Sequence, residues 1–446
     1  MSSIEQFGYK EELKRVLSTR DLLVYGMIFM VPIAPFAIFG FVWNDAKGMV
    51  PLAYLIGMFA MFFTALSYAT MSEAFPVAGS VYSYAQRGLH EVAGFFSGWL
   101  ILLDYILIPA LLYIVSAVAL QPMLPAVPAW AWIIGFIVFN GVVNLLGMQF
   151  TARANLVLLG IELIVLALFV GCGLVALYSG QGAGHLTMKP LYNPAVFNLA
   201  TVVGATSIAV LSFLGFDGIS TLSEDSNGGP KAIGRATLLS LVLVGALFLL
   251  QTWIAVDLSE GTSFKSPETA FYEISRMAGG VWLERVVLIS VALSSGVANA
   301  MAAQAAVSRI LFAMARDGKL PRILARIHPR YQTPYVSTVL VSAISLVAGL
   351  YFLQHLDDLS RLVNFGALCS FLVLHVCVVN HCFLRQRSGA WLRHLVSPLL
   401  GFTVIAYVLI EMDQRAKIMG LAWLAVGVVY YVVLTQVLKK PVTLEL

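Results

Sequence analysis

The sequence predicts an all-α integral membrane protein with twelve transmembrane helices, and three observations support this fold class. Of its 446 residues, 60% are hydrophobic and 11% are charged, whereas soluble domains carry about 25% charged residues. The apolar residues gather into twelve runs that are each long enough to cross a bilayer. The first and sixth runs are interrupted near their middle by proline or glycine, which membrane helices tolerate where their backbone lines a site.

The predicted membrane segments follow one another through most of the chain. Their approximate ranges are 21–43, 50–71, 92–118, 129–147, 154–179, 196–224, 233–256, 282–314, 335–353, 359–384, 395–412 and 418–438. Twelve crossings place both termini on one side, which then holds 19 of the 27 lysines and arginines. Cytoplasmic loops are enriched in these residues. We therefore expect a multi-pass protein of the cell (inner) membrane with both termini in the cytoplasm.

Several protein classes are excluded by what the chain contains. Residues 1–20 are polar and precede a run long enough to span, so no cleavable signal peptide is predicted. All four cysteines lie within apolar runs, which indicates reduced thiols. No phosphate-binding loop of the Walker type occurs. We therefore predict no cofactor, no ATP-driven transport and no nucleic-acid partner.

Two cytoplasmic stretches have a character of their own. Residues 73–91 are amphipathic and aromatic, and we expect them to form a short helix at the membrane interface. Residues 315–334 form the densest basic run of the chain. This run either rests on anionic membrane lipid or is a solvated loop that only sets the topology.

The interruption of the sixth segment carries an acid. Gly215 and Gly218 flank Asp217, and each glycine weakens the helix because it gains backbone freedom on unwinding. Carbonyls freed at membrane depth line a site, and a carboxyl there is costly enough to indicate function. The stretch therefore predicts a site for a cation. The alternative is a kinked helix in which Asp217 pairs with a neighbour.

The first segment is interrupted by Pro32 and Pro35. Each proline removes a backbone donor and disfavours helix in the residue before it. Five segments separate this interruption from the one in the sixth. Interrupted helices at corresponding positions of two halves mark the midplane site of a transporter. The alternative is a pair of unrelated kinks, since proline and glycine are common in membrane helices.

Taken together, several motifs resemble those of the amino acid–polyamine–organocation (APC) transporter superfamily, between about residues 15 and 435. They lie at 75–86, 94–99, 103–105, 212–217, 222–224, 308–309, 315–318, 328–330, 333–334 and 364–367. The resemblance implies two inverted five-helix repeats in which the first and sixth helices unwind at the substrate. It implies three parts: a cytoplasmic segment (1–20), a ten-helix core (21–384), and two further helices with a cytoplasmic tail (385–446).

Within that superfamily, the chain most resembles the bacterial putrescine importers. The shared features are the proline-containing first helix, the Leu-Asp-Tyr sequence at 103–105, the motif of the sixth helix and the Ser-Arg pair at 308–309. The resemblance implies an acidic residue at position 37, where this chain has Ala37. This departure leaves an amino acid as the alternative substrate.

The middle of the membrane is predicted to be net acidic. Asp104, Glu162 and Asp217 fall well inside apolar segments, and Arg309 is the single basic residue at comparable depth. Two of the six residues at 31–36 are prolines without an N–H group, so this interruption is poorly equipped to bind a carboxylate. An organic cation is therefore favoured. The predicted substrate-binding residues are Asp217, Asp104, Tyr105, Ile33, Ala34, Ala37, Ser212, Phe213, Gly215 and Phe216, whose aromatic members can stack on an ammonium group.

The acids are assigned different roles. Asp217 is expected to bind the ammonium group and to exchange a proton, because burial disfavours a charged carboxyl without a partner. Asp104 receives a second amine or pairs with a helix neighbour. Glu162 relays protons or is a hydrogen-bonded structural acid. Glu224 is expected to form a cytoplasmic gate with Arg309 or Lys231.

These assignments predict a secondary active transporter, not an enzyme, that imports a small organic amine or polyamine such as putrescine with a proton. An amino acid permease or exchanger is the alternative, and Ser294 and Ser295 would suit sodium coupling instead. A channel would need a filter-like loop, and none is visible. Cys377 and His381 share a helix face, but one helix cannot supply the four ligands of a zinc site, so no metal site is predicted.

Overall fold

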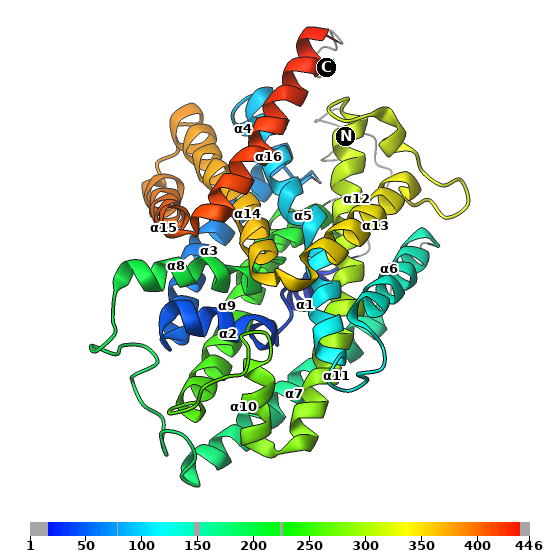
Figure 1. The fold of residues 1–446 in the computed structure, drawn as a ribbon. Coiled ribbons are helices and arrows are strands. Elements are labelled where there is room, and N and C mark those ends of the chain that lie inside the picture. Colours follow the sequence, from blue (N-terminus) through cyan, green and yellow to red (C-terminus); the bar gives the residue numbers. More distant parts are fainter. Residues whose placement is uncertain (1–16, 78, 147–151, 224–225, 438–446) are drawn as a thin grey trace.

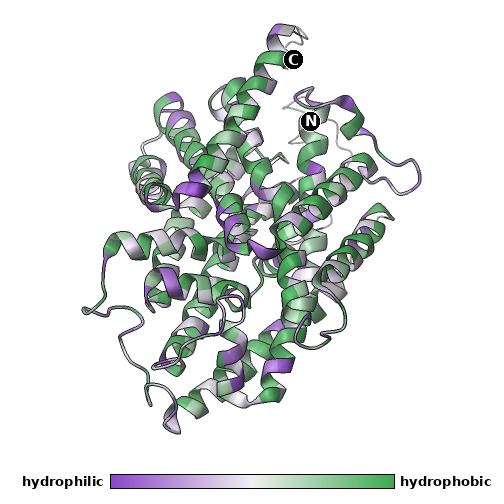
Figure 2. Ribbon diagram, viewed as in Figure 1, coloured by the Kyte–Doolittle hydropathy of each residue, from purple (hydrophilic) through white to green (hydrophobic). Residues whose placement is uncertain are grey.

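A computed structural model describes residues 17–77, 79–146, 152–223 and 226–437, and these form a bundle of helices (Figure 1). Figure 2 shows that hydrophobic residues cover most of the helices. Among the described residues, β-type backbone pairing is limited to one isolated bridge between Leu17 and Ser226. The chain is thus an all-α membrane protein, as its sequence predicts.

Ten helices or helix groups in the described ranges are long and apolar enough to cross a membrane. They are α3 (Val50–Ala74), α5 (Glu91–Leu120), α7 (Ala152–Tyr178), α8–η3 (Leu199–Leu222), α9 (Pro230–Leu258), α10–α12 (Ala270–Arg316), α13–η6 (Tyr335–Gln354), α14–η7 (Leu356–Arg385), η8–α15 (Leu392–Glu411) and α16–η9 (Gln414–Val437). An eleventh span is the bent pair α1 (Thr19–Met30) and α2 (Pro35–Ala46). The remaining predicted segment corresponds to α6 (Ala129–Leu145), of 17 residues, so the number twelve and the inverted repeat remain predictions.

The first interruption separates α1 from α2, whose axes meet at 52°. A capping box formed by Ser18 and Asp21 starts α1. The helix ends where Val31 adopts a positive φ of 54°, directly before Pro32. Pro35 then occupies the first position of α2, where its missing N–H costs no hydrogen bond. The two prolines therefore stop one helix and start the next.

The second interruption follows α8 (Leu199–Ala209). The 3₁₀ turn η2 (Val210–Phe213) leads to an extended Leu214, and Gly215 with φ 113° precedes the second 3₁₀ turn η3 (Phe216–Leu222). A Cβ atom on Gly215 would lie 2.7 Å from the carbonyl oxygen of Phe29 in α1. Glycine is therefore required for its conformation and for the close approach of the two backbones. The interruptions of the first and sixth segments lie side by side.

The helix α5 lies in the middle of the bundle, and several of the closest contacts between helices involve it. It runs antiparallel to α11 (Val281–Leu293), the π-helical turn η4 (Ser294–Asn299) and α12 (Ala300–Arg316), since Gly296 packs on Ser116 and Gly98 packs on Met314. Trp99 of α5 and Trp423 of α16 stack at 4.7 Å, and each indole N–H donates to the other residue's carbonyl.

The predicted interfacial helix is present as α4 (Ser80–Gly88), but its position differs from the prediction. All of its residues except Arg87 are buried, because α5 and α14 cover it. A Cβ atom on Gly94 of α5 would clash with Gln86, so the two helices touch at backbone distance. Its amphipathic pattern thus reflects packing against protein and not contact with the membrane surface.

Candidate functional site

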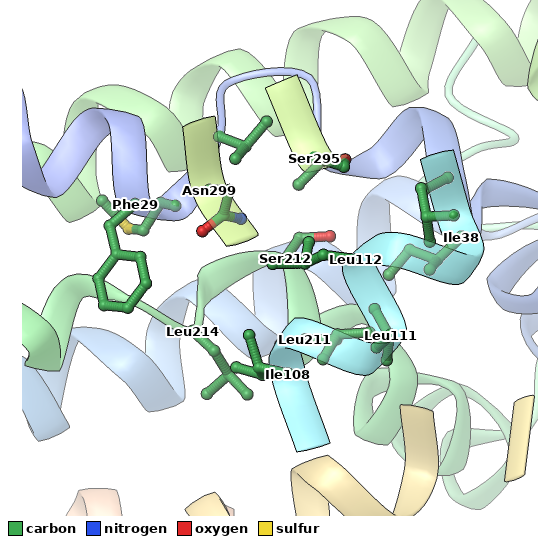
Figure 3. A pocket seen from close by; sticks show the side chains of 15 residues that line it. Phe29, Ile38, Ile108, Leu111, Leu112, Leu211, Ser212, Leu214, Ser295 and Asn299 are labelled. Atoms are coloured by element: carbon green, nitrogen blue, oxygen red, sulfur yellow. The ribbon is translucent and has the colours of Figure 1, made fainter. Parts of the chain in front are cut away.

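A cavity of about 60 Å³ lies where the two interruptions meet α5 and η4 (Figure 3). Its walls come from four parts of the chain: the end of α1 with the start of α2, the C-terminal half of α5, η2 with Leu214, and η4. This volume holds several water molecules, or the body of a small organic molecule. The two interruptions therefore enclose a cavity between them, and its use as a substrate site stays a prediction.

The cavity wall is mostly aliphatic. The polar side chains that line it come from Ser212, Ser295 and Asn299. Of the predicted substrate-binding residues, Ala34, Ala37 and Ser212 line it. The hydroxyl of Ser212 is also hydrogen-bonded to the hydroxyl of Tyr54, at 2.8 Å.

None of the seven other predicted substrate-binding residues lines this cavity: Asp104, Tyr105, Gly215 and Asp217 lie around the second interruption, and three belong to the hydrophobic core. These three are Ile33, Phe213 and Phe216. Phe213 packs against Phe248 at 5.1 Å and Phe216 packs against Tyr68 at 5.8 Å. Both rings thus belong to clusters of aromatic side chains.

Asp217 lies at the start of η3 and is 1% exposed. Its carboxylate accepts a 2.7 Å hydrogen bond from the hydroxyl of Tyr105 and a 3.3 Å hydrogen bond from the amide of Gly215. The unwound backbone and a tyrosine from α5 therefore hold this carboxyl in place. Its side chain makes no ion pair with a described lysine or arginine within the usual 4 Å.

Asp104 lies on α5, directly before Tyr105, and is equally buried. Its Oδ1 atom has no hydrogen-bond partner among the described residues. The carboxyls of Asp104 and Asp217 lie close enough to repel each other when both are charged. We call these two residues the acid pair. Together with Tyr105 they give the protein a buried acidic centre beside the cavity.

Glu162 of α7 is paired with a residue of the cavity-lining helix. The hydroxyl of Ser294 in η4 donates to its Oε1 atom, and its Oε2 atom has no partner in the described ranges. One of the two serines predicted to suit sodium thus contacts a carboxyl. The other, Ser295, lines the cavity. A buried acid is therefore connected to the cavity wall through adjacent residues of η4.

The first interruption offers few free donors. The amide of Ala34 donates to the carbonyl of Val31, that of Phe36 to Ile33, and that of Ala37 to Ala34, at 2.8 to 3.2 Å. Pro32 and Pro35 have no N–H group. Most amides of this interruption are therefore occupied or absent, which leaves little to bind a carboxylate.

The predicted cytoplasmic gate is only partly visible. Glu224 lies outside the described residues, and Arg309 lies half-buried on α12. Another set of contacts joins the end of α12 to α4 and to the start of α5, and the sequence pattern does not indicate these contacts. The hydroxyl of Tyr82 donates to Asp317 at 2.7 Å, and the buried Lys319 ammonium lies 3.4 Å from Glu91. Burial lowers the pKa of Lys319, and the carboxylate of Glu91 opposes that change.

Asn299 is the cavity residue that sequence reasoning missed. Its position as a polar residue in the middle of an apolar segment could have identified it from the sequence. The cysteine and histidine residues of α14 and η7 do not converge, and no group of three metal-ligand side chains occurs in the part of the chain that the structure describes. His375 instead contacts the hydroxyls of Ser67 and Thr64.

Comparison with known proteins adds a second kind of observation. A family model described as amino acid permease matches residues 21–437. The chain is 30% identical to the low-affinity putrescine importer PlaP of Escherichia coli K12, over 97% of this chain and 96% of that protein. It is 25% identical to the branched-chain amino acid permease BcaP of Bacillus subtilis (95% and 93% covered) and 26% identical to the methylthioribose transporter of that organism (94% and 93%). The similarity to these transporters thus runs along nearly the whole chain.

Proposed function

Because the chain belongs to the amino acid permease family of the APC superfamily, we propose that it is a secondary active transporter that imports a small organic amine or polyamine. The observation that carries this proposal is the acid pair beside the cavity. Two buried carboxyls without a cationic partner among the described residues suit a ligand that brings the positive charge. The relative named as a putrescine importer supports the same substrate class.

The import step is proposed to follow alternating access. The side-by-side interruptions of the first and sixth segments leave backbone hinges at the cavity, around which the adjoining half-helices can rotate. Rotation of the half-helices in one direction would open the cavity to one side of the membrane, and the reverse rotation would open it to the other side. The distribution of lysine and arginine supports an orientation with both termini in the cytoplasm of the cell (inner) membrane.

Proton coupling is proposed to involve Asp217 and Glu162. Both carboxyls are buried, and a buried carboxyl that loses its cationic partner is stabilised by taking up a proton. Asp217 would release its proton when the ammonium arrives. Glu162, bonded to Ser294, would transmit a change of charge to η4.

The second candidate function is amino acid transport, favoured by the aliphatic cavity wall and by the relatives named as branched-chain amino acid permeases. Counterflow in proteoliposomes tests both functions. Liposomes that contain the purified protein are loaded with unlabelled putrescine, butylamine or leucine, and the uptake of the same labelled compound is measured. Trans-stimulated uptake of an amine supports the proposal, whereas stimulation by leucine alone would replace it with the second function.

A further inference from the structure

Asn299 presents a hydrogen-bond acceptor that no described residue uses. It ends the π-helical turn η4, lines the cavity and is 8% exposed. Its Oδ1 atom has no partner within the described ranges. Buried polar atoms are nearly always paired, and π-helical turns of this kind are frequent at functional sites. The unpaired oxygen therefore indicates an acceptor for a donor group of a ligand.

The end of the cavity nearest Asn299 is its acidic end. In Figure 3, one side of the cavity holds Phe29, Leu214, Ile108 and Asn299. Asp104 precedes Ile108 by one helical turn, and Asp217 follows Leu214 by three residues. The acid pair thus lies beyond this end. Because η4 runs antiparallel to α5, Asn299 lies nearer to it than Ser295 does.

The opposite end is aliphatic. Ala37 and Ile38 of α2 contribute to it together with Leu112 and Val115 of α5. No carboxylate is among the described residues that line the cavity. A second positive charge at this end would lose its hydration without gaining a partner, which is strongly unfavourable. The cavity wall formed by the described residues is itself uncharged at both ends, and the two ends differ in their distance from the acid pair.

We propose that this cavity selects a short primary aliphatic monoamine. Its ammonium group donates to Oδ1 of Asn299 and faces the acid pair, and its alkyl chain packs against the aliphatic end. A diamine would place its second ammonium group among aliphatic side chains. A zwitterionic amino acid would place a carboxylate beside the acid pair, near a helix interruption with few free amides. This inference rests on the proposed amine transport and narrows its substrate.

The experiment measures binding to the purified full-length protein in nanodiscs, with propylamine, butylamine, pentylamine, 1,4-diaminobutane and leucine as competitors of labelled butylamine. We expect butylamine to bind at least about tenfold more tightly than 1,4-diaminobutane, and leucine to compete weakly. Equal or tighter binding of the diamine would overturn the inference and leave amine transport standing. If labelled butylamine does not bind and labelled leucine, measured in the same nanodiscs, does, the proposed function itself fails.

Substitutions of Asn299 test the acceptor. Asn299→Leu should weaken butylamine binding by about 10- to 100-fold, the usual effect of losing a hydrogen bond to a charged group. Asn299→Asp retains an acceptor oxygen and should bind at least as tightly as the wild type. Asn144→Leu is the matched control, since Asn144 bonds Gln304 of α12 and does not line the cavity. Unchanged affinity in Asn299→Leu, or an equal loss in Asn144→Leu, would contradict the assignment.

Discussion

The hydroxyl of Tyr105 donates a 2.7 Å hydrogen bond to Oδ2 of Asp217. A residue of α5 thus fixes the carboxyl that follows the interruption of the sixth segment. The backbone amide of Gly215 holds the other oxygen. Each carboxylate oxygen keeps further acceptor capacity, so an ammonium group can join without displacing either donor. The same bonds would hold a purely structural carboxyl, and mutation separates the two roles.

Asp217→Asn keeps the shape of the side chain and removes its charge. We expect near-complete loss of amine uptake with normal expression in the membrane. Removing one partner of a buried charge pair costs about 3–5 kcal/mol, which corresponds to at least roughly two orders of magnitude in affinity. The measurement is the initial uptake rate against external pH for the wild type and the variant.

Asp104→Asn is the comparison variant for Asp217→Asn. It removes a carboxyl of equal burial from the same acidic centre, but one that lies on the intact helix α5. We expect a milder loss, because no hydrogen bond joins the side chain of Asp104 to the unwound backbone in the described ranges, whereas Asp217 accepts one from Gly215. Wild-type affinity and an unchanged pH profile in Asp217→Asn would make Asp217 structural and move the coupling role to Glu162 or Asp104.

The fold was predictable because it depends on properties that are local in sequence. Apolar runs define the membrane segments, and Pro32, Pro35 and Gly215 interrupt helices through their own backbone chemistry. The prediction that the two interruptions lie side by side came from their corresponding positions in the two halves of the chain. The burial of α4 was not predictable, since an amphipathic helix shows the same pattern against lipid and against protein.

The details of the site depend on which face each helix presents to the cavity. The sequence alone does not determine this orientation. At the first interruption, Ala34 and Ala37 line the cavity whereas Ile33 packs into the core, because the unwound turn changes which side each residue faces. The pairing of Ser294 with Glu162 joins residues 132 positions apart. No periodicity within either segment could have indicated it.

Ala37→Asp places a carboxylate on the aliphatic side of the cavity. Because Ala37 lines the cavity, the new charge should accept the second ammonium group of a diamine. We expect the affinity ratio of 1,4-diaminobutane to butylamine to rise by at least about tenfold, which is near the lower range for a hydrogen bond to a charged group. Competition binding measures this ratio. A ratio equal to that of the wild type would show that the side chain at position 37 does not meet the substrate.

Glu162→Gln removes a titratable group and preserves the side-chain volume. If Glu162 carries the coupled proton, uptake into liposomes should no longer be accelerated when the outside is made acidic. Exchange of internal for external amine should continue, because it needs no net proton movement. Ser294→Ala removes the hydroxyl through which Glu162 contacts η4 and retains the titrating acid, so it should weaken the acceleration of uptake by external acid without abolishing it. Acid-stimulated uptake in Glu162→Gln at the wild-type level would assign the carboxyl a structural role.

Tyr82→Phe tests whether the contacts between α4, the start of α5 and the end of α12 hold this end of the bundle closed. The substitution removes one hydroxyl, and with it the 2.7 Å hydrogen bond to Asp317, while the neighbouring pair of Lys319 and Glu91 remains. Loss of a hydrogen bond to a charged group costs about 1.5–3 kcal/mol, so amide hydrogen exchange in 80–88 and 314–320 should become about tenfold faster or more. Tyr54→Phe is the control, because it removes a buried hydroxyl that bonds Ser212 at the cavity instead. Equal exchange in Tyr82→Phe and the wild type would mean that the bond between Tyr82 and Asp317 does not hold these segments together.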